Sequence, residues 1–368
     1  MKKFLLIIII LTIFYPFTVL ATDTSKSSIV MDIDSNRVLY EKNANEKRLI
    51  ASTTKIMTAL LALESNKMDN LVEAKEEILK MYGTSIYLSL HEKMKLRDLV
   101  YGLMLRSGND AAIVIATYLS GSEEEFVKKM NKKAKEIGMV NTTFQNAHGL
   151  DEETKNYSTA HDMALLSSYV YKNFKEYRTI TKTYKYQVQT EEKSYLWYNR
   201  NKLLKQYQGV DGLKTGYTKE AGYCIVTTCK KDNLRLIGVL MNEDKTPTRN
   251  EDMKGLLNYG YSKYQQIKLY SKGEVLDTLK IKDLVDQEVK VITPKDIYYL
   301  NDRASKGEVK TKIKYNQIEL PVFKNQKIGE LVVKKQNKTI ASYSLYLEKD
   351  VKKMNFLDKL LRVYKSLI

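Results

Sequence analysis

The sequence predicts an α/β domain, followed by a small all-β domain and an amphipathic helix at the C-terminal end. Two pairs of short apolar runs, each pair separated by turn residues, stand far apart in the 368-residue chain: Ser28 to Ile33 with Arg37 to Tyr40, and Ala221 to Cys229 with Leu234 to Met241. The sequence between these pairs is largely helical in its periodicity. Strands near both ends of a helical middle are typical of one domain whose sheet is assembled from distant segments.

The first residues have the pattern of an export signal. Lys2 and Lys3 precede the apolar stretch from Phe4 to Phe14, and Val19-Leu20-Ala21 offers a small-residue cleavage site. A helix needs roughly 20 apolar residues to span a bilayer, and this stretch is shorter. We therefore expect residues 1–21 to be a cleaved signal peptide and not an uncleaved anchor.

Three helices are expected inside the first domain and one at its end. The run from Ile56 to Leu63 is apolar on nearly every face, which favours a helix through the middle of the domain. Residues 96–105 and 110–119 form two further helical patterns, and Ser107-Gly108-Asn109 separates them. A fourth helical pattern runs from about Asn250 to Tyr264.

From about Leu269 to Leu347 the pattern changes to short alternating segments with turn residues every 8 to 12 positions, which predicts a small all-β domain. The expected organisation is an α/β domain at 22–267, a β-sandwich at 268–350 and a helix at 351–368. In this last segment Phe356, Leu360 and Tyr364 recur at helical spacing among many lysines. Such a helix is expected to lie on an anionic membrane surface; docking on the protein's own surface is the alternative.

Composition limits the possible partners and cofactors. Lys and Arg outnumber Asp and Glu by 61 to 44, a net charge of +17 that suits anionic polymers or lipids. Nucleic acid is not expected, because no DNA-binding or RNA-binding motif accompanies this charge. The three histidines lack metal-ligand spacing, and Cys224 and Cys229 should lie on opposite faces of one strand as unbridged thiols. No metal and no organic cofactor is expected.

Three short motifs follow one another along the chain: Ser52-Thr53-Thr54-Lys55, Ser107-Gly108-Asn109 and Lys214-Thr215-Gly216. Each alone is a weak signal in a sequence rich in Ser and Lys. The first opens the buried helix, the second lies on the break between two helices, and the third is expected immediately before a strand. This order and context are those of hydrolases with a serine nucleophile and a lysine base.

The first motif offers a nucleophile and its base. Residues three apart lie on one helical face, so the Lys55 amine can take the proton of the Ser52 hydroxyl. That requires a neutral lysine, and we expect burial and a second cation, Lys214, to lower the Lys55 pKa. The Ser52 N–H, at a helix N-terminus, is a natural donor to a developing oxyanion.

The other two motifs offer proton transfer and substrate binding. The Ser107 hydroxyl can pass a proton between Lys55 and the leaving amine, and the Asn109 amide can bind a peptide carbonyl of the substrate. Lys214 and Thr215 can bind a terminal carboxylate, and Gly216 allows a substrate strand to come close.

With the three motifs and the residues that flank them, the sequence resembles the low-molecular-mass penicillin-binding proteins that are serine-type D-Ala-D-Ala carboxypeptidases. The resemblance covers nearly the whole chain, and besides the three motifs it rests on Leu105 to Ala112, Asn146 to Asp151 and Val210 to Thr218. It implies a penicillin-recognising α/β fold of the β-lactamase-like transpeptidase type, with a five-stranded antiparallel sheet and a helical subdomain.

The resemblance also implies roles and partners. Ser52 would be acylated, Tyr217 would supply the second oxyanion N–H, and Arg200 and Arg249 would lie near the substrate carboxylate. The substrate would be a peptidoglycan stem peptide, and β-lactam antibiotics would inhibit. The protein would act at the outer face of the cytoplasmic membrane, on the cell wall side.

Two other functions remain open at this point. A class A-like β-lactamase would need a deacylating glutamate between the second and third motifs, where Glu152 and Glu153 lack convincing placement. A non-catalytic cell-wall-binding protein would not need the three intact motifs.

Overall fold

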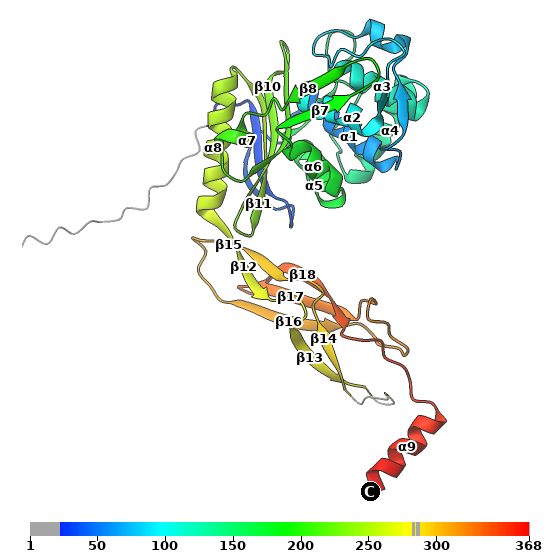
Figure 1. Cartoon of the computed structure of the whole chain (residues 1–368). Coiled ribbons are helices and arrows are strands. Elements are labelled where there is room, and N and C mark those ends of the chain that lie inside the picture. The colour runs from blue at the N-terminus through cyan, green and yellow to red at the C-terminus, as the bar shows by residue number, and fades with distance from the viewer. Residues whose placement is uncertain (1–22, 282–283, 285–287, 368) are drawn as a thin grey trace, which may run out of the picture.

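The computed structural model describes residues 23–281, 284 and 288–367. These residues form a larger α/β domain, a smaller β domain next to it and a helix at the far end (Figure 1). The expected signal peptide at 1–21 lies outside the described residues.

The larger domain is built on a five-stranded antiparallel sheet of order β2-β1-β11-β10-β9. Its strands come from both ends of the domain: β1 (Ser27–Asp32), β2 (Val38–Lys42), β9 (Val210–Thr218), β10 (Gly222–Lys231) and β11 (Leu234–Glu243). The first strand pairs with β11, so that Ser28 lies opposite Leu240. The predicted sheet of distant segments is therefore confirmed, and β9 forms one edge.

Each face of this sheet is covered by helices, which creates two cores. Alternate residues of β1 enter different cores: Ile29 and Met31 pack with α1 (Lys55–Glu64) and α5 (Ala160–Asn173), whereas Val30 packs with α8 (Thr246–Lys263). Figure 1 shows α8 on the opposite side of the sheet from α5. The sheet is thus the middle layer of the domain.

The two cysteines of β10 also point to opposite faces of the sheet. Cys224 belongs to the core that contains α1, and Cys229 belongs to the core that contains α8. Both are buried and free. The prediction of two unbridged thiols on opposite faces of a strand is confirmed.

A helical subdomain surrounds α1. The predicted break between its helices is found at Ser107, where a turn of π-helix ends with the backbone in the left-handed conformation (φ 69°). The subdomain and its short connecting elements comprise β3 (Arg48–Leu49), η1 (Ala51–Thr54), β4 (Leu71–Glu73), η2 (Glu76–Lys80), β5 (Lys93–Lys95), α2 (Leu96–Tyr101), η3 (Gly102–Arg106), α3 (Asn109–Ser120), α4 (Glu123–Ile137), β6 (Tyr157–Ser158), α6 (Lys175–Lys182), β7 (Lys185–Gln189), β8 (Ser194–Tyr198) and α7 (Leu203–Gln206).

The second domain is all-β, as expected. Its strands are β12 (Tyr264–Tyr270), β13 (Val275–Lys280), β14 (Glu288–Ile292), β15 (Ile297–Asp302), β16 (Val309–Tyr315), β17 (Gly329–Lys335) and β18 (Lys338–Leu347). Five of them form a sheet of order β13-β14-β18-β17-β16, and β12 pairs with β15. A separate core that includes Val291, Leu331 and Leu345 holds this domain together.

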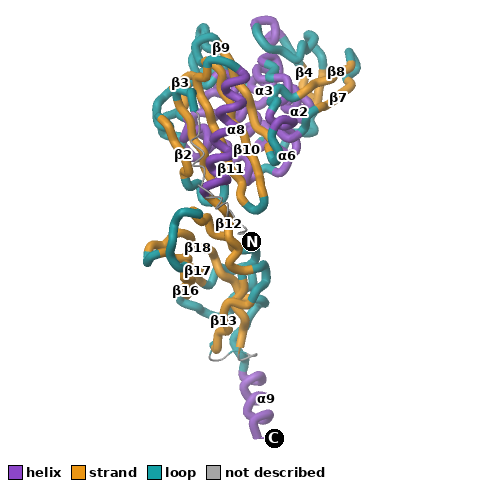
Figure 2. The backbone as a smooth tube through the Cα atoms, turned by 90° about the vertical axis from the view of Figure 1, so that its left-hand side faces the viewer, coloured by secondary structure: helices purple, strands orange, loops and turns teal. Residues whose placement is uncertain are grey.

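The last described element is α9 (Phe356–Leu367), which extends from the β domain at the end opposite the α/β domain (Figures 1 and 2). Its apolar side chains are at least half exposed: Phe356 81%, Leu357 61%, Leu360 56%, Leu361 50%, Val363 58% and Tyr364 63%. Within the described ranges, no helix combines the length and the apolar character needed to cross a bilayer.

Candidate active site

Ser52 and Lys55 lie next to each other at the start of α1. The short helix η1 carries Ser52 directly into α1, whose first residue is Lys55. The Lys55 Nζ donates to Ser52 Oγ at 3.1 Å and to Asn109 Oδ1 at 2.7 Å. A third hydrogen bond goes to the carbonyl of His148. The lysine amine is therefore fixed beside the hydroxyl by two further acceptors.

The Lys55 side chain is fully buried. Burial lowers its pKa to about 7; the charge of Asp110 acts to raise the pKa, and the charge of Arg200 lowers it further. The nearby cation that lowers this pKa is thus Arg200, whereas we expected Lys214. At neutral pH a large part of Lys55 is uncharged, as a general base requires.

Ser107 joins the second motif to the third. The Nζ of Lys214 donates to Ser107 Oγ at 3.0 Å and to the Thr215 carbonyl at 2.9 Å. The pKa of Lys214 lies well below its ordinary value, first because of burial and then because of the charges of Lys55, Arg200 and Arg249. Lys55 thus contacts Ser52 and Lys214 contacts Ser107, and the pKa of each lysine is lowered.

The third motif lies within β9 (Val210–Thr218), so the expectation that it precedes a strand was wrong. A Cβ atom on Gly216 would lie only 3.1 Å from the backbone nitrogens of Ser52 and Thr53. Glycine lets the edge strand lie directly against the segment that carries the nucleophile. The sequence predicted that Gly216 makes room for the substrate. In the structure the absence of a Cβ atom also makes room for the backbone of Ser52 and Thr53.

The loop from Asn146 to Asp151 contributes a group that sequence reasoning missed, the carbonyl of His148 that accepts from Lys55. Asn146 Oδ1 accepts from the backbone N–H of His148 and of Gly149. Gly149 has φ 86°, and a Cβ there would overlap the Ala51 carbonyl at 2.0 Å. Burial and the Lys55 charge lower the His148 pKa to about 3, so its ring is neutral.

Asn109 and Asp110 hold a second loop over the site. The Asn109 amide accepts from Lys55 through Oδ1 and donates through Nδ2 to the Tyr82 carbonyl at 2.7 Å. Asp110 accepts from the backbone N–H of Ile86 at 3.0 Å and of Leu88 at 3.1 Å. One of the two Asn109 amide protons is therefore used within the protein, in the hydrogen bond to the Tyr82 carbonyl.

A cleft of about 690 Å³ opens in front of these groups. Its lining includes Ser52, Ser107, Thr84, Tyr184, Asn199, Arg200, Lys202, Lys205, Gln206, Thr215, Gly216, Tyr217, Tyr223, Thr246 and Arg249. Lys55, Asn109 and Lys214 do not line the cleft and are buried behind Ser52 and Ser107. All ten predicted site residues thus lie in or directly behind one cleft.

The cleft is cationic. Arg200 donates to Thr84 Oγ1 at 3.2 Å, and Arg249 donates to Asn250 Oδ1. Burial lowers the pKa of Arg249 to about 10, which still leaves it charged at neutral pH. Among the described residues no Asp or Glu lines the cleft. Glu152 and Glu153, weighed above as deacylating residues, are exposed and do not line it.

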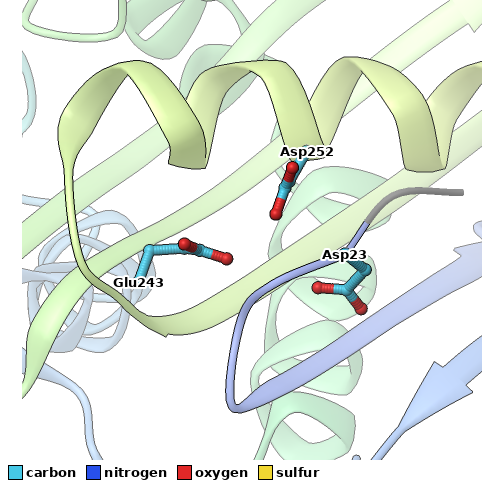
Figure 3. Close-up of side chains that lie close together, drawn as sticks. All are labelled: Asp23, Glu243 and Asp252. Carbon is cyan, nitrogen blue, oxygen red and sulfur yellow. The ribbon is translucent and has the colours of Figure 1, made fainter.

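A separate group of three carboxylates, Asp23, Glu243 and Asp252, lies between the start of the described chain and α8 (Figure 3). The Thr24 hydroxyl donates to both Glu243 and Asp252. Burial and the nearby Asp252 charge raise the Glu243 pKa to about 7. The raised pKa of Glu243 favours a proton on this carboxyl group beside Asp252, and none of the three carboxylates lines the cleft.

Comparison with known proteins places this geometry in a family. The family model described as D-alanyl-D-alanine carboxypeptidase matches residues 18–245, and the one described as penicillin-binding protein 5, C-terminal domain, matches 264–353. D-alanyl-D-alanine carboxypeptidase DacF of Bacillus subtilis is 38% identical over 349 residues, which are 92% of this chain and 88% of the relative.

Solved structures agree. Penicillin-binding protein 5 from Haemophilus influenzae matches with a TM-score of 0.73 at 29% identity, over 90% of this chain and 98% of that chain. A variant of the Streptomyces K15 DD-transpeptidase matches with a TM-score of 0.63 at 32% identity, over 66% of this chain and 99% of that chain. The expected penicillin-recognising fold is therefore confirmed, and the chain belongs to the D-alanyl-D-alanine carboxypeptidase family.

Proposed function

We propose that this protein removes the terminal D-Ala from peptidoglycan stem pentapeptides through an acyl-enzyme on Ser52. The observation that carries the proposal is the 3.1 Å hydrogen bond between Lys55 Nζ and Ser52 Oγ, combined with a Lys55 pKa of about 7. A hydroxyl beside a neutral amine is an activated nucleophile. Its position at a cationic cleft suits a peptide that ends in a carboxylate.

In the acylation step Ser52 Oγ attacks the carbonyl carbon of the penultimate D-Ala while Lys55 takes the hydroxyl proton. The backbone N–H groups of Ser52 and Tyr217 stabilise the oxyanion. Ser107, which accepts a hydrogen bond from Lys214 at 3.0 Å, then gives its hydroxyl proton to the leaving amine and takes up the proton that Lys55 received from Ser52. Water hydrolyses the ester and restores the Ser52 hydroxyl.

Thr215, Arg249 and Arg200 bind the terminal carboxylate of the substrate, and all three line the cleft. A charged guanidinium offers paired N–H donors that match a carboxylate. Asn109 lies directly behind this cleft, and its second amide proton would bind a backbone carbonyl of the stem peptide that reaches past Ser52 and Ser107. A β-lactam that mimics the D-Ala-D-Ala backbone acylates the same serine and inhibits the enzyme.

The pH dependence tests the role of Lys55. The base must be uncharged, so kcat/KM for D-Ala release should rise with pH through the Lys55 pKa of about 7 and then level off. For a single base this means a gain of about 50-fold from pH 5 to pH 7 and less than about 2-fold from pH 7 to pH 9. Circular dichroism at each pH verifies that the protein stays folded. A flat profile between pH 5 and pH 8 would exclude a titrating lysine as the base.

We also propose that α9 attaches the exported protein to the outer face of the cytoplasmic membrane. Support comes from the exposed apolar side chains of Phe356, Leu357 and Leu360, and from the lysines around them in the sequence.

Deletion of residues 352–368 should move the mature protein from the membrane pellet to the soluble fraction. The apolar face of α9 is the part that inserts between head groups, and anionic lipid strengthens its binding. Vesicle sedimentation with and without anionic lipid measures the loss. The double substitution Lys132→Gln with Lys135→Gln removes two exposed positive charges from α4 and is the control for a general loss of net charge. Unchanged sedimentation of the truncated protein would contradict an anchor at α9.

A further inference from the structure

A second cavity, of about 670 Å³, shares no lining residue with the catalytic cleft. It lies between η2, α3, the first turn of α4 and the loop that contains His148. Two of its lining residues, Tyr82 and His148, also hold catalytic groups through their backbone carbonyls. The Tyr82 carbonyl accepts from Asn109, and the His148 carbonyl accepts from Lys55. A ligand in this cavity therefore contacts the segments that position the base.

The walls of this cavity are acidic, in a chain whose net charge is +17. Four glutamates and one lysine line it: Glu76, Glu77, Glu123, Glu153 and Lys80. None of the four glutamates forms an ion pair with a lysine or arginine of the described residues. Burial raises the pKa of Glu123, and the group that opposes this rise is the Ala147 N–H and not a cation. The cavity thus offers carboxylates to a positively charged ligand.

The buried ring of His148 is a second, independent indication of a ligand. His148 is only 8% exposed and lines the cavity. The Leu150 N–H donates to its Nδ1 at 3.1 Å, so the neutral ring carries its proton on Nε2. This Nε2 lies 3.6 Å from Glu123 Oε1, which is too far for a hydrogen bond. Among the described residues this buried donor has no acceptor, and a ligand in the cavity can supply one.

These groups fit an organic cation better than a metal ion. A neutral ring that binds a metal through Nε2 carries its proton on Nδ1, where the Leu150 N–H already donates. Among the described residues, the glutamates and His148 do not form a group of three that could hold a metal. The apolar side chains of Met81 and Ile113 and the exposed ring of Tyr82 suit the methylene stems and charged ends of basic side chains.

We propose that this cavity is a regulatory site that binds a cationic peptide segment of a partner protein and makes Lys55 a base at lower pH. The basic side chains bind the glutamates, and a backbone carbonyl of the peptide accepts from the His148 Nε2–H. A cavity of about 670 Å³ has room for a few residues of such a segment. The inference goes beyond the proposed function and rests on it only for the role of Lys55.

The charge of the bound peptide acts on Lys55 across His148. The Lys55 charge lowers the pKa of the His148 ring, so the ring and the amine interact electrostatically. The other titratable and charged groups near this amine are Asp110 of α3, Arg200 after β8 and Lys214 of β9. A further positive charge in the cavity acts in the same direction as Arg200 and against Asp110. Lys55 then loses its proton at lower pH.

The rate of acylation of the full-length mature protein by a fluorescent penicillin tests the inference. The probe is the tripeptide Lys-Gly-Lys, acetylated and amidated at its ends, at constant ionic strength. We expect it to raise the rate by about 2- to 5-fold at pH 6. At pH 8, where Lys55 is already largely uncharged, the gain should be less than about 1.3-fold. Spermidine has ammonium groups but no carbonyl, and an equal effect of spermidine would overturn the assignment of a peptide.

Two double variants locate the effect. Glu76→Gln with Glu153→Gln removes two exposed carboxylates of the cavity and should abolish most of the gain at pH 6. Glu191→Gln with Glu192→Gln removes two exposed carboxylates from the turn between β7 and β8, outside the cavity, and should keep the gain. Isothermal titration calorimetry should show one bound peptide in the wild type and binding about 3- to 10-fold weaker in the cavity variant.

The outcomes separate this inference from the proposed function. A wild type whose rate at pH 6 is unchanged by the peptide would overturn the inference and leave the proposed function intact. An equal gain in the wild type and in the Glu76 and Glu153 variant would also overturn it. A wild type that penicillin does not acylate at either pH would instead overturn the proposed function.

Discussion

Replacement of Ser52 by alanine is expected to abolish both covalent labelling by penicillin and release of D-Ala. Ser52 Oγ is the hydroxyl in the cleft that accepts a hydrogen bond from Lys55, so no other group can take its place in that geometry. The rate of D-Ala release should fall by more than about 10⁴-fold. Mass spectrometry of the intact protein after penicillin treatment should show no mass increase, whereas the wild type gains one penicillin that maps to Ser52.

A serine at the other end of the same helix is the matched control. Ser65 caps α1, and its hydroxyl donates to the Ala62 carbonyl. The variant Ser65→Ala should label and release D-Ala as the wild type does. An adduct in Ser52→Ala, above all one on Ser107, would remove Ser52 from the role of nucleophile.

The second large effect is expected for Lys55→Arg. A guanidinium stays charged at every accessible pH, so it can still donate hydrogen bonds but cannot accept the Ser52 proton. Asn109 Oδ1 and the His148 carbonyl, which accept from Lys55, would keep a donor, and the fold should therefore be retained. Loss of a positioned base should lower the rate of acylation by about 10²- to 10⁴-fold. Stopped-flow measurement with a fluorescent penicillin gives this rate directly.

The pH profile separates a lost base from a disturbed site. In Lys55→Arg the rise of activity through pH 7 should disappear, because no group with that pKa remains beside Ser52. Lys128→Arg on the exposed face of α4 is the control for the substitution itself and should keep the wild-type profile. A Lys55→Arg enzyme that retains both its rate and its pH dependence would show that the proton goes elsewhere.

Much of the fold and of the candidate site could be predicted because the signals are local. The paired strands 28–33 and 37–40 follow from apolar runs and turn residues, and α1 follows from a run that is apolar on nearly every face. The short motifs could be recognised because Ser52 and Lys55 are neighbours in one helix. Residues three or four positions apart in a helix lie on the same face, so their proximity can be predicted from the sequence alone.

Other parts of the site depend on contacts between distant segments. The His148 carbonyl is a backbone group, so no side-chain pattern marks it, and the left-handed turn at Gly149 beside it is visible only in the structure. The cation that lowers the Lys55 pKa is Arg200, from a segment far along the chain, and only the fold shows that it is close. The strand β9 was not predicted, because Lys214, Thr215 and Gly216 interrupt its apolar pattern.

The position of β9 at the edge of the sheet has a further consequence. An edge strand leaves a row of backbone groups unpaired, and two molecules that expose such edges can join into one continuous sheet. Here α6, η1 and η3 pack against β9, so the edge forms a wall of the cleft. The cleft beside β9 has room for a single extended peptide, but not for the edge strand of another protein together with the rest of its sheet. The same walls that shape the reaction site therefore protect the enzyme from self-association through its own sheet.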